Sequence, residues 1–177
     1  MKRHPDSQCD ALKSVDVDIL RCRPDRLDLR FCVRGAIGSL LLPPPGEPGR
    51  ADQLWRHTCF EAFIRASGIG PYFEFNFSPS RQWGAYSFEA YRSGMQIFDG
   101  FRTPGVEVHT NDDTCKLAAV LELSCLSRAA DWYLGLSAVI EERNGRMSYW
   151  ALAHPPGKPD FHHADCFALK LPAPWSA

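Results

Sequence analysis

Hydrophobic and polar residues alternate along much of this chain. In residues 27–34 every second residue is apolar, and the positions between them hold aspartate, arginine and cysteine. This period of two is typical of a strand with one buried face. Similar patterns predict further strands at 15–22, 58–65, 72–78, 83–91, 106–110, 116–123, 132–142, 147–153 and 166–171. About ten strands at this spacing predict an all-β fold, an antiparallel β-sandwich of jelly-roll type.

Turn-forming residues separate the predicted strands. Asn144-Gly145 is the strongest hairpin signal, and residues 67–71 and 111–113 are further turns. Residues 43–49 contain four prolines and two glycines. They lack most of the backbone donors that a strand or helix needs, so they predict an exposed loop. Only residues 126–133 suggest a helical turn.

Side-chain parity limits how the central strands can pair, because directly opposed residues point to the same face of a sheet. If 58–65 and 72–78 form a hairpin, one allowed register builds a solid apolar face. It sets Phe60, Ala62 and Ile64 against Phe77, Phe75 and Phe73. On the opposite face Glu61 then lies opposite Asn76, and Phe63 opposite Glu74. Two carboxylates and an amide share that surface.

The next strand, 83–91, can extend this polar face. One allowed register adds Trp83, Ala85 and Ser87 to it and sends Gly84, Tyr86 and Phe88 to the phenylalanine face. Small residues beside a tryptophan leave room for a ligand. The face then combines acidic and amide groups with aromatic rings, as a sugar-binding surface does. The alternative is an ordinary solvated sheet face, which is also polar.

Length and charge limit the possible partners. The 177 residues suffice for one domain, 1–177, but not for a second full one. A net charge of −1 provides no field that would hold nucleic acid. The charged start is followed by no apolar signal core, and no window approaches the ~18 apolar residues of a membrane-spanning helix, so we expect a cytoplasmic protein without membrane association. Seven cysteines without a C-x-x-C pair indicate neither a disulfide framework nor a zinc site.

Three segments, residues 54–64, 72–83 and 149–163, carry a resemblance to a known family, the family-9 carbohydrate-binding modules and the related DOMON-like domains of bacteria. Residues 54–64, L-W-R-H-T-C-F-E-A-F-I, are similar to one strand of that family. Residues 72–83, Y-F-E-F-N-F-S-P-S-R-Q-W, resemble the following segment, except that Arg81 stands where the pattern has glycine. Residues 149–163 resemble its closing signature. The resemblance implies a sugar-binding β-sandwich.

The resemblance also implies a ligand cleft that contains a tryptophan and, six positions later, a glutamate. Trp55 and Glu61 keep this spacing. Glu74 stands where the family has a cleft arginine, and the second tryptophan that sandwiches the sugar has no counterpart here. Both departures favour a wider class of polar ligand over a defined sugar.

Two cofactors are possible alternatives. Some DOMON relatives hold haem between a methionine and a histidine or lysine, and Met95 with His154, His162 or His163 offers such a pair. Residues 111–113 offer oxygens for calcium, although a plain turn explains them as well. The adjacent His162 and His163 would rarely reach one metal ion from an extended strand.

We therefore expect a non-catalytic domain that binds a small ligand, a saccharide or another small polar molecule, on one sheet face. Glu61 and Glu74 could act as an acid/base pair, but no nucleophile with an oriented base accompanies them. The runner-up is a haem-binding electron-transfer domain, and the third alternative is a structural or protein-interaction domain. The predicted ligand-binding residues are Trp55, Glu61, Tyr72, Glu74, Asn76, Trp83, Arg92 and His162.

Overall fold

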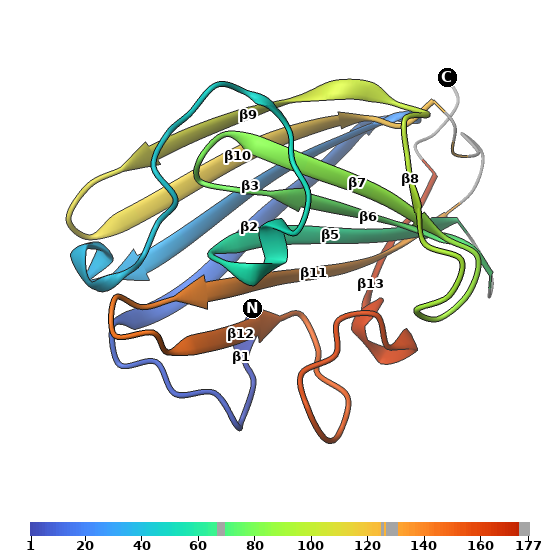
Figure 1. Ribbon diagram of the computed structural model, residues 1–177. Helices are drawn as coiled ribbons and strands as arrows, with labels where there is room; N and C mark the ends of the chain where they lie inside the picture. The colour runs from blue at the N-terminus through green and yellow to red at the C-terminus, as the bar shows by residue number, and fades with distance from the viewer. Residues whose placement is uncertain (67–69, 125, 127–130, 174–177) are drawn as a thin grey trace.

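The computed structural model describes residues 1–66, 70–124, 126 and 131–173 (Figure 1). The described strands form two sheets. Within each sheet, neighbouring strands pair antiparallel, except that β4 and β7 pair parallel. The prediction of an all-β antiparallel β-sandwich is confirmed. No helix in the described ranges is long and apolar enough to span a membrane.

The smaller sheet has four strands in the order β2-β3-β10-β9. Its members are β2 (Leu12–Arg23), β3 (Arg26–Gly35), β9 (Arg102–Thr110) and β10 (Thr114–Glu122). The alternation predicted for residues 27–34 is confirmed. Leu27, Leu29, Phe31 and Val33 are buried, whereas Arg30 and Arg34 are exposed.

The larger sheet has nine strands. Its path is β1-β12-β11-β5-β6-β7-β4, with β13 paired to β11 and β8 paired to β7. The strands are β1 (Lys2–Arg3), β4 (Gly49–Arg50), β5 (Cys59–Ala66), β6 (Tyr72–Phe77), β7 (Gln82–Phe88), β8 (Gln96–Ile97), β11 (Trp132–Glu141), β12 (Met147–Ala151) and β13 (Leu169–Leu171). Three short 3-10 turns accompany them: η1 (Ile37–Ser39), η2 (Leu54–Arg56) and η3 (Ala164–Cys166).

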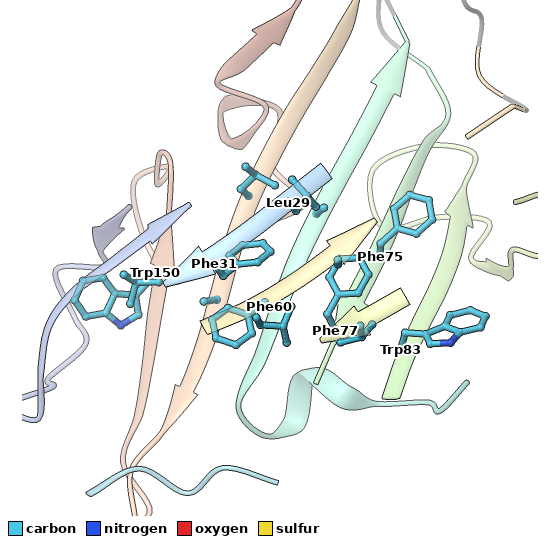
Figure 2. Close-up of a cluster of buried hydrophobic side chains, with 14 of the residues drawn as sticks. Leu29, Phe31, Phe60, Phe75, Phe77, Trp83 and Trp150 are labelled. Atoms are coloured by element: carbon cyan, nitrogen blue, oxygen red, sulfur yellow. The ribbon is translucent and has the colours of Figure 1, made fainter. Parts of the chain in front are cut away.

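The main hydrophobic core lies between the two sheets. Figure 2 shows Phe31 of β3 near Phe60 of β5, and their ring centroids are 5.0 Å apart. Phe75 and Phe77 of β6 are buried in the same cluster. Each fully buried side chain of this size contributes roughly 1.5–3 kcal/mol through the apolar area it removes from water.

The register predicted between β5 and β6 is confirmed at each position. Phe60 pairs with Phe77, Ala62 with Phe75 and Ile64 with Phe73 on the core face, while Glu61 pairs with Asn76 and Phe63 with Glu74 on the outer face. The outer face of the larger sheet is not a plain solvated surface. It carries a second cluster of buried apolar residues, which includes Phe63, Tyr86 and Phe88.

The register predicted for β7 is wrong. Trp83 pairs with Phe77 and Ala85 with Phe75, so both lie on the core face, and Trp83 belongs to the main core. Gly84, Tyr86 and Phe88 lie on the outer face instead of the phenylalanine face. The cause is the turn between β6 and β7, whose length shifts the pairing by one residue, and a shift of one residue exchanges the two faces of a strand.

Most of the connections form as predicted. Residues 43–48 form the predicted loop, with 44–48 exposed, and Gly49 of the predicted 43–49 already begins β4. The Asn144-Gly145 turn joins β11 to β12, with Gly145 N donating to Glu142 O. The last strand is shorter than the predicted 166–171, because η3 occupies its start. Residues 67–69 of one predicted turn and 127–130 of the predicted helical turn lie outside the described residues.

Candidate functional site

A cleft of about 390 Å³ opens on the outer face of the larger sheet. Its floor comes from β5, β6, β7, β11 and β12, and its walls come from η2 and from the segments that follow β7 and β12. The lining residues are Trp55, Glu61, Phe63, Glu74, Phe88, Arg92, Met95, Val139, Tyr149, Pro159, Phe161 and His162. In Figure 1, η2 lies over the larger sheet on the side turned to the viewer.

Trp55 reaches the cleft because its segment passes close over β7. Gly84 makes this approach possible, since a Cβ at that position would lie only 3.0 Å from the Ala51 carbonyl oxygen. The Tyr86 hydroxyl donates to Asp52 Oδ1 at 2.8 Å and ties the segment to the sheet. The Trp55 and Tyr86 rings then meet edge to face at 5.6 Å, which fixes the indole at one wall.

Glu61 and Glu74 lie on the cleft floor, on neighbouring strands. Both are buried, with 3 % and 5 % of their surface exposed. Each has one carboxyl oxygen held by a neighbouring side chain. Ser137 Oγ donates to Glu61 Oε2 at 2.7 Å, and Asn76 Nδ2 donates to Glu74 Oε1 at 2.7 Å. These bonds fix the orientation of both carboxyl groups.

The environment of the floor favours the neutral form of both carboxyls. Burial raises the pKa of Glu61 to about 8, and repulsion by Glu74 adds to the shift, while the Ser137 hydrogen bond and the Arg92 charge oppose it. Burial also raises the pKa of Glu74 to about 7, against the opposing effects of the Asn76 hydrogen bond and Arg92. Near neutral pH the pair is therefore partly protonated.

A hydrogen-bond chain supports the wall beside Glu74. The backbone N–H of Arg92 donates to Tyr72 Oη at 3.2 Å, and this hydroxyl lies 2.8 Å from His162 Nδ1. The chain is satisfied when Tyr72 donates to Nδ1 and His162 carries its proton on Nε2. That nitrogen faces Glu74 Oε2 at 3.7 Å. The ring edge is also enclosed by Phe63 and Phe88, with centroids 5.0 and 5.1 Å away.

In the described lining of the cleft, neither His162 nor Arg92 is an unpaired cation. Burial lowers the pKa of His162 to about 4, with Arg92 adding to the shift and Asp160 opposing it, so the imidazole is neutral at neutral pH. The Arg92 guanidinium binds Asp160 Oδ1 through Nη2 at 2.8 Å and Nε at 3.2 Å. Arg92 also has a positive φ of 51°, a backbone conformation that is strained for a residue with a side chain.

The structure brings five of the eight predicted residues to the cleft: Trp55, Glu61, Glu74, Arg92 and His162. Asn76 and Tyr72 lie beside it and support Glu74 and His162 through hydrogen bonds. Trp83 does not take part, since it points into the main core and is 7 % exposed.

Several cleft residues were missed by the sequence reasoning. The predicted β5–β6 register already placed Phe63 on the outer face, although it was not chosen as a site residue. Phe88 is recognisable from strand parity only with the correct β7 register, and Tyr149 from the alternation in β12. Phe161 lies in a segment without periodicity, and no sequence pattern indicated its place. Met95 had been considered only as a haem ligand.

The candidate haem and calcium ligands lie in different surroundings in the structure. Met95 and His162 line the same cleft, although both ring nitrogens of His162 face protein groups. His154 Nε2 donates to the Lys2 carbonyl oxygen, and His163 Nδ1 accepts from Asp165 N, so each has a local partner. At the calcium candidate, Asn111 Oδ1 accepts from the backbone N–H groups of Asp113 and Thr114, as in a plain turn. Within the described residues no group of three His, Cys, Asp or Glu side chains could hold a metal ion.

Comparison with known proteins supports the fold. No protein-family model matches the chain, and no curated protein sequence matches it. One solved structure with a similar fold is that of a proposed carbohydrate-binding protein from Bacteroides uniformis. Its TM-score is 0.60 at 13 % sequence identity, and the match covers 85 % of this chain and 74 % of that one. At this identity the likeness establishes the fold alone.

Proposed function

We propose that residues 1–177 form one non-catalytic domain that binds a small polar ligand, of the saccharide class, in the cleft on the outer sheet face. The observation that carries this proposal is the pair of buried, oriented carboxyls of Glu61 and Glu74 at the floor of an aromatic-walled cavity. Ligand pockets combine apolar walls with a few fixed polar groups in this way. On an ordinary solvated sheet face, carboxyl groups stay exposed, because burying them costs free energy.

Two further observations support a saccharide-type ligand. Trp55 and Tyr149 line the cleft, and their rings can stack on the C–H faces of a sugar. The similar fold of a proposed carbohydrate-binding protein, and the resemblance of residues 54–64 and 72–83 to family-9 carbohydrate-binding modules and DOMON-like domains, point in the same direction.

A binding role fits the cleft better than catalysis. Its described lining contains no serine, threonine or cysteine that could act as a nucleophile. Ser137 Oγ, beside the floor, is a donor to Glu61 rather than a partner of His162. Both glutamates lie on one floor, supported by hydrogen bonds that hold them in place.

Isothermal titration calorimetry against a panel of mono- and disaccharides tests the proposal. We expect saturable binding that is lost in Trp55→Ala and weakened at least about tenfold in Glu61→Gln. Glu107→Gln, an exposed change on β9 of the other sheet, is the control and should bind as the wild type does. A panel that shows no heat and no thermal stabilisation at high ligand concentration would refute the proposal.

A haem-binding role is the second candidate, because Met95 and His162 line one cleft. Against it, His162 would have to give up its contact with Tyr72 or Glu74 to ligate iron. Titration with haemin decides between the two. A Soret band that sharpens on addition of the protein and is lost in Met95→Ala would favour haem, whereas an unchanged haemin spectrum would eliminate it.

A further inference from the structure

The floor of the cleft offers acceptors without matching donors. Glu61 and Glu74 each use one carboxyl oxygen in a hydrogen bond with the protein. No hydrogen bond from the described part of the chain reaches Oε1 of Glu61 or Oε2 of Glu74, and His162 Nε2 stays 3.7 Å from the latter. Since both glutamates line the cavity, these oxygens are available to a bound ligand.

Among the described residues that line the cleft, no cation forms a hydrogen bond with either carboxylate. Arg92 is the cationic residue of the described lining, and its guanidinium is bound to Asp160 and half exposed. His162 is enclosed by aromatic rings and is a neutral ring at neutral pH. Removing one partner of a buried ion pair is strongly unfavourable, so two buried carboxyls need either protons or a cation from outside.

The walls above these carboxyls are suited to a cation. Trp55, Phe88, Tyr149 and Phe161 line the cleft. The face of an aromatic ring attracts an ammonium group, and the attraction is larger where the cation is desolvated. An ammonium group is also three donors with no acceptor, whereas a sugar hydroxyl needs both a donor and an acceptor. In its ionised form the cleft floor, with two acceptor-only carboxylates, matches the ammonium group.

We propose that the cleft binds a small ligand bearing a protonated primary amine, an amino sugar being the saccharide of this class, with the ammonium group held by Glu61 and Glu74. This inference rests on the proposed function, because it assigns a charge and a polar group to the ligand of the same cleft. The aromatic walls contact the carbon skeleton, and the two free carboxyl oxygens accept from the ammonium.

Such a ligand changes the protonation of the floor. Among the described residues, the ionisable groups around the two carboxyls include Asp52, Cys59, Tyr72, Tyr86, Arg92, Tyr149, Asp160 and His162. Arg92 is paired with Asp160, and Asp52 accepts from Tyr86, so neither pair supplies a free charge to the floor. An arriving ammonium stabilises the ionised form of Glu61 and Glu74, and protons bound to these carboxyls are released to the solvent. Binding therefore releases protons.

The test compares D-glucosamine with D-glucose and with N-acetyl-D-glucosamine, which have the same ring but no cation, by calorimetry on the full chain. We expect glucosamine to bind at least about tenfold more tightly than either neutral sugar. Its heat should depend on the ionisation enthalpy of the buffer in the sense of proton release. Cyclohexylamine against cyclohexanol is a second matched pair and should show the same preference.

The variants Glu61→Gln and Glu74→Gln remove the charge but keep the shape of the floor. We expect each variant to bind glucosamine no more tightly than glucose, so that the ratio of the two affinities falls at least about tenfold from its wild-type value. If a variant fails to fold, the inference is decided on the wild type alone, by the two matched ligand pairs and by the proton release on binding. Equal or tighter binding of glucose overturns the ammonium inference and leaves saccharide binding intact. If none of the sugars or amines binds, both proposals fail.

Discussion

His162 Nδ1 lies 2.8 Å from the Tyr72 hydroxyl, and this contact joins the β12–β13 segment to the floor of the larger sheet. Tyr72 is 4 % exposed, and it accepts in turn from the backbone N–H of Arg92. One phenol therefore contacts two segments that line the cleft, the one after β7 and the one after β12. We infer that the site depends on this hydroxyl, although Tyr72 does not line the cavity.

Tyr72→Phe removes the hydroxyl and keeps the ring, which stacks on Phe88 at a centroid distance of 4.8 Å. We expect the free energy of unfolding to fall by about 1–2 kcal/mol, because His162 and the Arg92 N–H lose a partner in a part-buried place. Ligand affinity should fall as well. Tyr133→Phe, on a half-buried tyrosine of β11, is the control. Unchanged stability and unchanged affinity in Tyr72→Phe would contradict the positioning role.

Stability should depend on pH through the glutamate pair, with a sign opposite to that of most carboxylates. The folded-state pKa values of Glu61 and Glu74 are about 8 and about 7, above the ordinary 4.5. Between the ordinary pKa of 4.5 and the folded-state values of about 7 and about 8, the folded protein holds more protons than the unfolded chain. Stability is therefore lost as pH rises from about 4.5 to about 8. His162, with its pKa lowered to about 4, acts in the other direction: its contribution is lost as pH falls below 6.5.

Glu61→Gln separates the effect of the glutamate pair from that of His162, because the glutamine amide imitates a protonated carboxyl and does not titrate. Relative to the wild type, its free energy of unfolding should rise on the order of 2 kcal/mol between about pH 5 and about pH 8. Urea denaturation at a series of pH values measures this difference. Glu107→Gln should show no such trend, and a Glu61→Gln difference that is flat with pH would mean that Glu61 is ionised without penalty.

Strand parity determined how much could be predicted from the sequence. The β5–β6 register followed from one requirement, that the phenylalanines share a face, and it placed Glu61, Glu74 and Asn76 correctly. Parity did not select one register for β7, because Trp83 and Tyr86 are both aromatic and each could lie on either face of the sheet. The turn at residues 78–81 decided the register, and turn geometry of that kind is not encoded in a hydrophobic pattern. Phe161 and Pro159 come from an irregular segment, whose position depends on tertiary contacts.

The two tryptophans that were expected in the site should now behave differently. Trp83→Ala should destabilise the protein by about 3–5 kcal/mol, because it empties a large volume in the main core. The folded fraction should still bind ligand. Trp55→Ala should cost about 1 kcal/mol of stability, since its side chain is half-buried, and should abolish binding. Chemical denaturation and calorimetry on both variants check this. Loss of binding in folded Trp83→Ala would contradict the observed register.

Arg81 has a φ of 72°, in the left-handed region that favours glycine, and it occupies the position where the resembling sequence pattern has glycine. The turn there is closed by backbone bonds, with Arg81 N donating to Ser78 O and Ser78 N to Gln82 O, so the conformation is held in place. A residue with a side chain costs about 1–2 kcal/mol in this region. Glycine loses more chain entropy on folding, which offsets part of the gain.

Arg81→Gly should therefore raise the free energy of unfolding by about 0.5–1 kcal/mol. Arg81→Ala is the matched control: it removes the same exposed side chain but keeps the Cβ, so it should bring no gain. Thermal and urea denaturation of the two variants give the comparison. An equal gain in both would assign the effect to the arginine side chain and not to the backbone. Ligand binding should be the same in both variants, because the turn lies between the end of β6 and the start of β7, outside the residues that line the cleft.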